Sequence, residues 1–372
     1  MAFDFDYERL KFAWEDASRG KRNAPNQQRY RYDLEYNLYA LLDDLKNDSF
    51  TPSPLREKPI YYPKFRIAQV PSLEDKIVQH ACIDGYGYQA LTNPIIPEAS
   101  ACLRQRGEKY AIKLFRNQLR HFYNQHGCRP LILKCDIHSY FASIPHDRVE
   151  ALIARYVQDD TVRRVLLKFV RMTDKGLPLG LQQSQLLANL YLSEMDHALK
   201  ERHGVKFYGR YMDDFYIMSD SLEELQKLLA WIKGYLESIG LELNPKTAIF
   251  ESSVDYLGFT FKMMPTGKIV MRLRKDKAKT QKRWVRKLAE MLGHGEITAE
   301  YAGESYHGWR EHASHGDCGN MIRAMDKRYA EALRKVGYRL IITEKRVIVC
   351  REPLQNSHQD KSCTSTRPWA TF

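Results

Sequence analysis

The sequence predicts an α+β fold, in which helices and short strands alternate along 372 residues. Leucines recur at helical spacing in residues 29–48 and 221–240, which is typical of amphipathic helices. Short runs of apolar and aromatic residues at 129–135 and 207–218 are typical of strands. At 372 residues the chain is long enough for two or three subdomains around one or two cores, and a hydrophobic content of 44% indicates a globular protein.

The individual elements follow from these periods and from the Gly and Pro residues that interrupt them. Helices are expected over residues 5–20, 29–48, 73–91, 101–125 and 147–171, after the Gly-Pro loop within 175–202, over 221–240, and from 272 onward. Strands are expected over 59–71, 129–135, 207–218 and 241–261, with a small hairpin over 338–351 and a polar tail over 352–372.

The charge balance points to a polyanionic partner. Lys and Arg number 58 against 46 Asp and Glu, a formal net charge of +12. Such a surplus is most often matched by nucleic acid, although a basic enzyme without such a partner stays open. Seven cysteines without a C-x-x-C pair indicate neither a zinc knuckle nor a disulfide framework. With no signal-peptide core and no apolar stretch approaching 18 residues, a reduced cytoplasmic protein is expected.

Two adjacent aspartates, Asp213 and Asp214, interrupt the apolar run FYGRYMDDFYIM at residues 207–218. Two other Asp-Asp pairs have ordinary explanations, since one lies within a helix at 43–44 and one precedes a helix at 159–160. Strand-forming residues on both sides place Asp213 and Asp214 at the tip of a hairpin. A turn is also an ordinary position for aspartate, so this pair alone does not establish a site.

A further carboxylate, Asp136, ends the apolar strand LILKCD. If that strand neighbours the hairpin in one sheet, Asp136, Asp213 and Asp214 converge at its edge. Three such groups repel one another unless a cation intervenes. Two Mg²⁺ ions about 3.5–4 Å apart would turn the cluster into a site for in-line phosphoryl transfer.

Five ordered motifs resemble those of reverse transcriptases. They are PKFR (63–66) with EDKIVQHA (74–81), DIHSYFASI (136–144), LPLGLQQSQLLANLYLSEMD (177–196), YMDD (211–214) and YLGF (256–259). The sequence is similar to the bacterial, retron-type and group II intron-like branch of this family. The resemblance implies a right-hand polymerase: fingers over 1–130 with part of 145–178, a palm with an antiparallel sheet over 131–262, a basic helical thumb over 263–338, and a hairpin and tail over 339–372.

The resemblance also implies the metal site. Asp136, Asp213 and Asp214 would bind two Mg²⁺ ions, for which Mn²⁺ could substitute, together with the backbone carbonyl of Ile137. Lys246 would lie near the departing pyrophosphate as a cation or general acid, with a solvated strand lysine as the alternative.

Further family positions imply how a nucleotide is bound. Lys64 and Arg66 match the cations that hold the triphosphate. Phe141 falls at the bulky gate that would exclude a ribose 2′-OH, with an ordinary packed aromatic as the alternative. Gly180 would let the backbone approach the nucleotide closely.

Two departures from the common family pattern indicate a subclass. Leu179 replaces a glutamine of many relatives, and Gln185 stands where the usual motif has proline. The resulting L-G-x-x-x-S-Q pattern resembles the reverse transcriptases of diversity-generating retroelements, which copy a template RNA with errors at adenines.

Primer and template contacts are expected from two segments. The hairpin and the YLGF motif would supply Tyr211, Met212, Leu257 and Gly258. In residues 272–287 nine of sixteen are Lys or Arg, and a solvated face is the alternative to a surface that grasps duplex phosphates. The cations assigned to the duplex are Arg272, Arg274, Lys275, Lys279, Lys282 and Arg283.

The predicted function is RNA-directed DNA synthesis by the enzyme of a diversity-generating retroelement, encoded by a bacterium or phage. Its expected partners are template RNA, the cDNA product, dNTPs, a structured non-coding RNA and a small basic oligomeric accessory protein. An antiphage-defence reverse transcriptase and a catalytically silent RNA-binding scaffold are the alternatives. A retron enzyme is less expected, because the Asn-Ala-x-x-His and Val-Thr-Gly signatures of retrons are not found in the chain. A group II intron maturase is less expected, because the chain has no Cys-rich endonuclease region.

Overall fold

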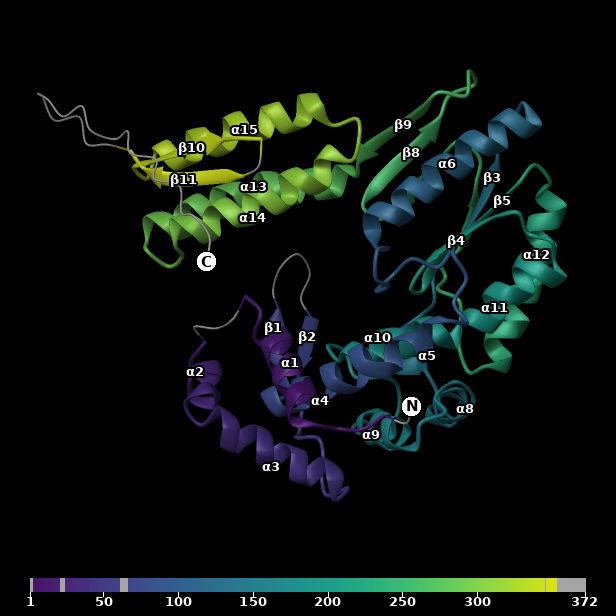
Figure 1. Cartoon of the computed structure of the whole chain (residues 1–372). Coiled ribbons are helices and arrows are strands. Elements are labelled where there is room, and N and C mark those ends of the chain that lie inside the picture. The colour runs from purple at the N-terminus through teal and green to yellow at the C-terminus, as the bar shows by residue number, and fades with distance from the viewer. Residues whose placement is uncertain (1–2, 21–23, 61–65, 345, 353–372) are drawn as a thin grey trace, which may run out of the picture. The chain divides into compact units, whose positions relative to one another are not determined.

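The computed structural model describes residues 3–20, 24–60, 66–344 and 346–352, which fall into two compact units. Unit 1 extends to Met271 and unit 2 begins at Arg272. Unit 1 combines helices with antiparallel sheets, and unit 2 is mainly helical (Figure 1). The α+β class expected from the sequence is therefore confirmed.

Unit 1 begins with three helices and a hairpin. Asp6 caps α1 (Tyr7–Ser18) by accepting from Arg9 N, and α2 (Pro25–Tyr32) starts with proline at its first position. The helix expected over 29–48 is interrupted at Asp33 and continues as α3 (Leu34–Lys46). Strands β1 (Arg56–Ile60) and β2 (Arg66–Val70) then pair antiparallel.

Two helix predictions need correction. The helix expected over 101–125 begins only at α6 (Glu108–His126), because Gly107 has a φ of 140° that a helix does not permit. The helix expected over 147–171 is two helices, α8 (His146–Tyr156) and α9 (Asp160–Val170). Asp159 separates them and caps α9, accepting from the backbone N–H groups of Thr161 and Val162.

The remaining helices of unit 1 follow the expected order. They are α4 (Leu73–Cys82), a π-helical turn η1 (Ile83–Gly87), α5 (Tyr88–Thr92), α7 (Tyr140–Ser143), α10 (Gln182–Tyr191), α11 (Ser193–His197), η2 (Ala198–Arg202) and α12 (Leu222–Ser238). Ser72 and Asp75 form a reciprocal capping box at the start of α4.

The central sheet of unit 1 has the order β4-β5-β3-β6, and every neighbouring pair is antiparallel. Its strands are β3 (Leu131–Cys135), β4 (Phe207–Tyr211), β5 (Asp214–Ser219) and β6 (Ala248–Phe250). On one face the ring of Phe115, from α6, contacts Tyr216 edge-on with centroids 4.6 Å apart. On the other face Phe215 and Ile217 join the main core with Leu225 of α12. The sheet is therefore covered on both sides.

A smaller sheet in the order β7-β8-β9 follows, and its last strand extends past the end of unit 1. Strands β7 (Ser253–Tyr256) and β8 (Phe259–Met263) form a hairpin, and β9 (Ile269–Leu273) follows. Leu257 and Gly258 alone connect β7 to β8, with φ values of 46° and 84°. Positive φ at both central positions is what a type I′ hairpin turn requires.

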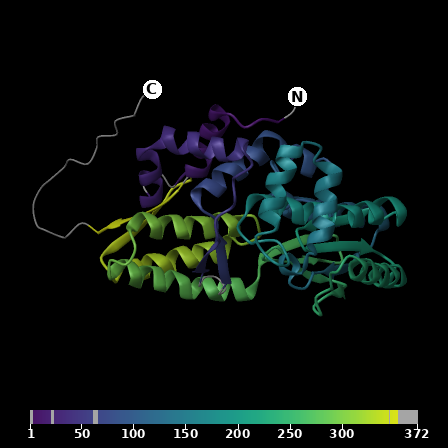
Figure 2. The same ribbon diagram turned by 90° about the horizontal axis from the view of Figure 1, so that it is seen from below.

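Unit 2 packs three helices and a hairpin around its own core. Figures 1 and 2 show α13 (Lys275–Gly293), α14 (Ala299–Ser314) and α15 (Gly319–Arg334) side by side. The core includes Leu288 and Tyr329 among its buried side chains. The hairpin expected over 338–351 is present as β10 (Tyr338–Ile342) and β11 (Val347–Arg351). The expected tail lies, beyond residue 352, outside the described residues.

Within the described residues, none of the helices combines the length and the apolar character that crossing a membrane requires.

Candidate active site

The pairing of β3 with β5 brings the predicted carboxylates to one edge of the central sheet. Cys135 pairs with Phe215, so the next position places Asp136 beside Asp214. Tyr211 pairs with Asp214 across the hairpin, and Met212 and Asp213 form its two-residue turn. Residues distant in the sequence therefore meet here, as the sequence predicts if the strands are neighbours.

Asp213 lies half-buried in this turn. Burial, and then the nearby charge of Asp136, raises the pKa of Asp213. Without a cation, the charge of Asp136 destabilises the charged form of Asp213. Carboxylate oxygens close to one another in a partly dry site are a donor set that suits a divalent cation.

Lys134 is a cation of this edge that the sequence predictions missed. Strand register puts Lys134, Asp136 and Asp214 on the same face, and Lys134 Nζ lies directly against Asp214 Oδ1. Burial lowers the pKa of Lys134 to about 8, although the neighbouring carboxylates oppose that shift. A lysine inside an apolar strand, two residues before Asp136, is the signal that could have identified it.

The orientation of the Ile137 carbonyl follows from the hydrogen bonds of its neighbours. Asp136 O accepts from Asn244 N at 2.7 Å, and His138 N donates to Glu242 O at 2.9 Å. Both bonds lie on the side of Leu243, the bridge partner of Ile137. Because successive peptide groups of a strand alternate in direction, the Ile137 carbonyl points to the opposite side, which is that of β5.

Lys246 lies on an exposed turn that is tied to the same edge. Asn244 connects the two, because its N–H binds Asp136 O and its side-chain Oδ1 accepts from Lys246 N at 3.1 Å. The turn therefore places Lys246 near Asp136 in the chain's fold, while its role stays a prediction.

Phe141 follows Asp136 by five residues and belongs to the short helix α7. Its half-buried ring packs edge-on against Tyr140 of α7, and its carbonyl accepts from Leu177 N at 2.7 Å. This bond joins α7 to the loop that carries Leu179 and Gly180.

The loop before α10 presents Leu179 on the surface. The Leu179 side chain is 48% exposed, and Leu179 N donates to Gln69 Oε1 at 3.1 Å. Gly180 has a φ of 105°, and a Cβ there would lie 2.4 Å from Gln69 O. Glycine is therefore required by the approach of β2 as well as by its conformation. Gln185 is half-buried on the first turns of α10.

Two residues, Lys64 and Arg66, are the cations predicted to hold the triphosphate. Lys64 lies outside the described residues, and of Arg66 only the backbone, at the start of β2, is described.

The predicted primer and template contacts divide between the two units. In unit 1, Tyr211 and Met212 belong to the β4–β5 hairpin, and Leu257 and Gly258 form the β7–β8 turn. In unit 2, α13 buries an apolar stripe that includes Val285 and leaves a basic face in solvent. The exposed cations of the predicted set are Arg272, Lys275, Lys279, Lys282 and Arg283, while the half-buried Arg274 pairs with Asp276 at 3.0 Å.

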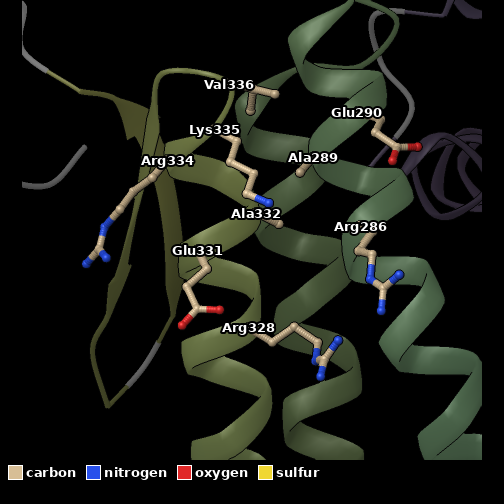
Figure 3. A pocket seen from close by; sticks show the side chains of 9 residues that line it. All are labelled: Arg286, Ala289, Glu290, Arg328, Glu331, Ala332, Arg334, Lys335 and Val336. Atoms are coloured by element: carbon tan, nitrogen blue, oxygen red, sulfur yellow. The ribbon is translucent and has the colours of Figure 1, made fainter.

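A pocket of about 620 Å³ lies between α13 and α15 in unit 2. Figure 3 shows that Arg286 lines it from α13 and Arg328 from α15, whereas Arg334 points away. Glu290 and Glu331 also line the pocket, so its charge is mixed rather than purely basic. The sequence predictions did not anticipate it.

Asp16, His80 and Asp84 form a separate group that could hold a metal ion, with ligand atoms within 4.8 Å of one another. Two arginines already occupy its carboxylates, because Arg19 pairs with Asp16 and Arg104 binds Asp84 at 2.6 Å. Asp136, Asp213 and Asp214 do not form so tight a group, and Asp214 lies against Lys134.

A family profile described as reverse transcriptase (RNA-dependent DNA polymerase) matches residues 56–261, more than half of the chain. The matched region runs from β1 into β8 and contains all three aspartates. The chain therefore belongs to the reverse transcriptase family. Together with the antiparallel sheets and helices described above, this membership confirms the predicted right-hand polymerase fold class.

Two curated relatives are similar to part of the chain. Protein YkfC of Escherichia coli K12 is 27% identical in an alignment 190 residues long, which covers 46% of this chain and 47% of YkfC. The group II intron-encoded protein LtrA of Lactococcus lactis is 26% identical in an alignment 176 residues long, which covers 44% of this chain and 28% of LtrA. The chain thus spans less than half the length of these relatives.

Solved telomerase structures align with lower identity. Apo telomerase from Candida tropicalis, truncated from its C-terminal domain, has a TM-score of 0.44 and 15% identity, covering 63% of this chain and 59% of that one. Telomerase from Candida albicans with a fragment of telomeric RNA has a TM-score of 0.48 and 11% identity, covering 82% and 60%.

Proposed function

We propose that the chain is an RNA-directed DNA polymerase whose reaction takes place at the β3–β5 edge. One observation carries this proposal: antiparallel pairing puts Asp136 beside the turn that bears Asp213 and Asp214. Family membership and the positive net charge agree with a nucleic-acid substrate.

Each residue of the edge has a distinct part in this proposal. Asp136, Asp213 and Asp214, with the Ile137 carbonyl, would hold divalent cations such as Mg²⁺. When bound there, such ions lower the barrier by activating the primer hydroxyl and stabilising the leaving pyrophosphate. Lys134 holds Asp214 in place through their contact. Lys246, on its exposed turn, would neutralise charge on the pyrophosphate as it departs.

The subclass proposed is the error-prone polymerase of a diversity-generating retroelement. Leu179 supports it, because its exposed isobutyl group cannot make the hydrogen bond to a nucleotide that the glutamine of many relatives can make. A looser check on base-pair geometry would follow. Gln185 on α10 completes the L-G-x-x-x-S-Q pattern, which resembles that of this subclass.

Primer extension on a defined RNA template, with Mg²⁺ and dNTPs, followed by sequencing of the product, tests both levels. DNA made by the wild type and not by Asp136→Asn supports the polymerase. Errors concentrated opposite template adenines support the subclass, whereas accurate DNA would favour a defence enzyme or another retroelement.

Leu179→Gln tests the residue assigned to fidelity. We expect fewer misincorporations, with Leu222→Gln as a matched control, because Leu222 is 50% exposed at the start of α12. An unchanged error spectrum in Leu179→Gln would remove this residue from fidelity. A wild type that makes no DNA, even with its native RNA and accessory protein, would favour the RNA-binding scaffold.

A further inference from the structure

Arg210 of β4 is a buried charge that the proposed chemistry leaves unused. Arg210 has essentially no exposed surface, and its partner Asp196, in α11, is buried equally completely. Burial disfavours the charge of Arg210, and Asp196 more than offsets this effect, so the pKa of Arg210 is raised. A buried arginine persists only where its charge and its donors are satisfied.

All five N–H donors of Arg210 have partners. Nε donates to Asp196 Oδ1 at 2.9 Å, and Nη2 donates to Asp196 Oδ2 at 2.6 Å and to Asn189 O at 3.0 Å. Nη1 donates to Asn189 Oδ1 at 2.9 Å and to Met212 O at 3.0 Å. The guanidinium therefore joins α10 and α11 to the hairpin turn in one fixed geometry.

The contact with Met212 bears directly on Asp213. Met212 has a φ of 60°, a conformation that residues with a side chain rarely adopt. Its carbonyl belongs to the peptide group that leads into Asp213, and that group is planar. A hydrogen bond to this carbonyl therefore holds the plane of the peptide group between Met212 and Asp213. The backbone from which the Asp213 side chain extends is held with it.

The groups that hold Arg210 are themselves fixed. Its backbone N–H donates to Glu98 O, and its carbonyl accepts from both N and Oγ of Ser100, each at 3.0 Å. Tyr208 donates its hydroxyl to Asp196, and Asn189 donates its amide to Ala101 O. The guanidinium thus has little freedom to follow a displaced turn.

We propose that Arg210 is the positioning residue for Asp213, acting through the Met212 carbonyl. This role rests on the proposed function, because it takes Asp213 to be a ligand of a divalent cation. An ion pair that served stability alone would need Asp196 but not the turn. The bond from Nη1 to Met212 O connects the ion pair to the site.

The test compares Arg210→Lys with Tyr208→Phe. Lysine keeps a positive charge beside Asp196 but lacks the fork that reaches Asn189 and Met212 together. Tyr208→Phe removes a hydrogen bond from the same carboxylate and leaves the contact with Met212 intact. Binding of Mn²⁺ to the full chain, without nucleic acid or nucleotide, is measured by electron paramagnetic resonance. Asp213→Asn is the reference for a lost ligand.

For Arg210→Lys we expect Mn²⁺ affinity and kcat to fall by about 10–100-fold, as when groups that orient metal ligands are removed. Affinity for the primer–template duplex should stay near that of the wild type, and Tyr208→Phe should bind Mn²⁺ normally. Folded Arg210→Lys with wild-type Mn²⁺ affinity and kcat would overturn the proposal, as would an equal loss in Tyr208→Phe.

If Arg210→Lys does not fold, Asn189→Ala takes its place. It keeps the ion pair and removes one acceptor of Nη1, so a smaller fall in Mn²⁺ affinity is expected, and wild-type affinity would overturn the proposal. A wild type that binds Mn²⁺ through Asp213 but makes no DNA would contradict the proposed function. A lower Mn²⁺ affinity in Arg210→Lys would even then support the positioning role.

Discussion

Charged side chains occur in two contrasting settings in this protein. At the β3–β5 edge a few charges, such as Lys134 and Asp214, are partly buried and touch one another. On α13 many cations, such as Lys279 and Lys282, are exposed along one helix. Partly buried charges interact strongly and depend on position, whereas exposed charges are screened and act nearly additively. A single substitution should therefore have a large effect at the β3–β5 edge, whereas substitutions on α13 should have small effects that add up.

The largest effect is expected for Asp213→Asn. Loss of a metal ligand should reduce the rate of DNA synthesis at least about a thousandfold, since bound metal supplies several kcal/mol of transition-state stabilisation. In EDTA the variant should unfold at a temperature no lower than the wild type, because the raised pKa of Asp213 shows that its charged form is disfavoured. Primer extension and thermal unfolding measure the two quantities.

Added Mg²⁺ should raise the melting temperature of the wild type more than that of Asp213→Asn. If Asp213→Asn still makes DNA at the wild-type rate, the β3–β5 edge tolerates the loss of a charge as α13 does. The expected difference between the two regions would then be wrong.

Lys134→Met should have the next largest effect, because Asp214 loses its cation. We expect kcat to fall by about 10–100-fold, as for other groups that orient metal ligands. Since burial lowers the pKa of Lys134 to about 8 from 10.5, the unfolded chain holds this proton over a pH range in which the folded chain has released it. In EDTA the free energy of unfolding of the wild type should therefore gain a contribution as pH rises from 8 toward 10.5.

Denaturant unfolding across that pH range checks the expectation, and Lys134→Met should lack the contribution. An identical pH profile for the two proteins would mean that Lys134 behaves like an exposed lysine of α13.

A triple substitution of Lys279, Lys282 and Arg283 by Gln should have a graded effect on duplex binding. If each contacts one phosphate, the slope of log K against log salt should become shallower by about two to three. The matched control replaces Lys327, Arg334 and Lys335, which are exposed in and just after α15 and carry the same charge. Equal changes in both variants would indicate a general charge effect rather than a binding face on α13.

The smallest effect is expected for Lys282→Gln alone. The salt slope should change by about one unit or less, and kcat at saturating duplex should stay unchanged. Lys282 and Lys134 carry the same charge, so a loss of kcat in Lys282→Gln like that in Lys134→Met would remove the distinction between buried and exposed cations.

Local signals in the sequence predicted most elements of the fold. Leucine periodicity anticipated α3 and α12, and the flanking aromatics anticipated the β4–β5 hairpin. The limits of α6 were missed because Gly107 was not recognised as a helix stop. The sequence predicted Asp159 as a helix cap, but it did not predict that α8 ends before Asp159 and that a separate helix, α9, begins after it.

For the candidate site, the sequence by itself determined which carboxylates end strands or occupy a turn, and where the basic helix lies. These properties depend on near neighbours along the chain, so composition and period reveal them. Only the tertiary structure decided that β3 lies beside β5, that Lys134 contacts Asp214, and that Arg210 joins Asp196 to the Met212 carbonyl. Those contacts depend on strand register and on packing between distant segments, which local sequence patterns do not encode.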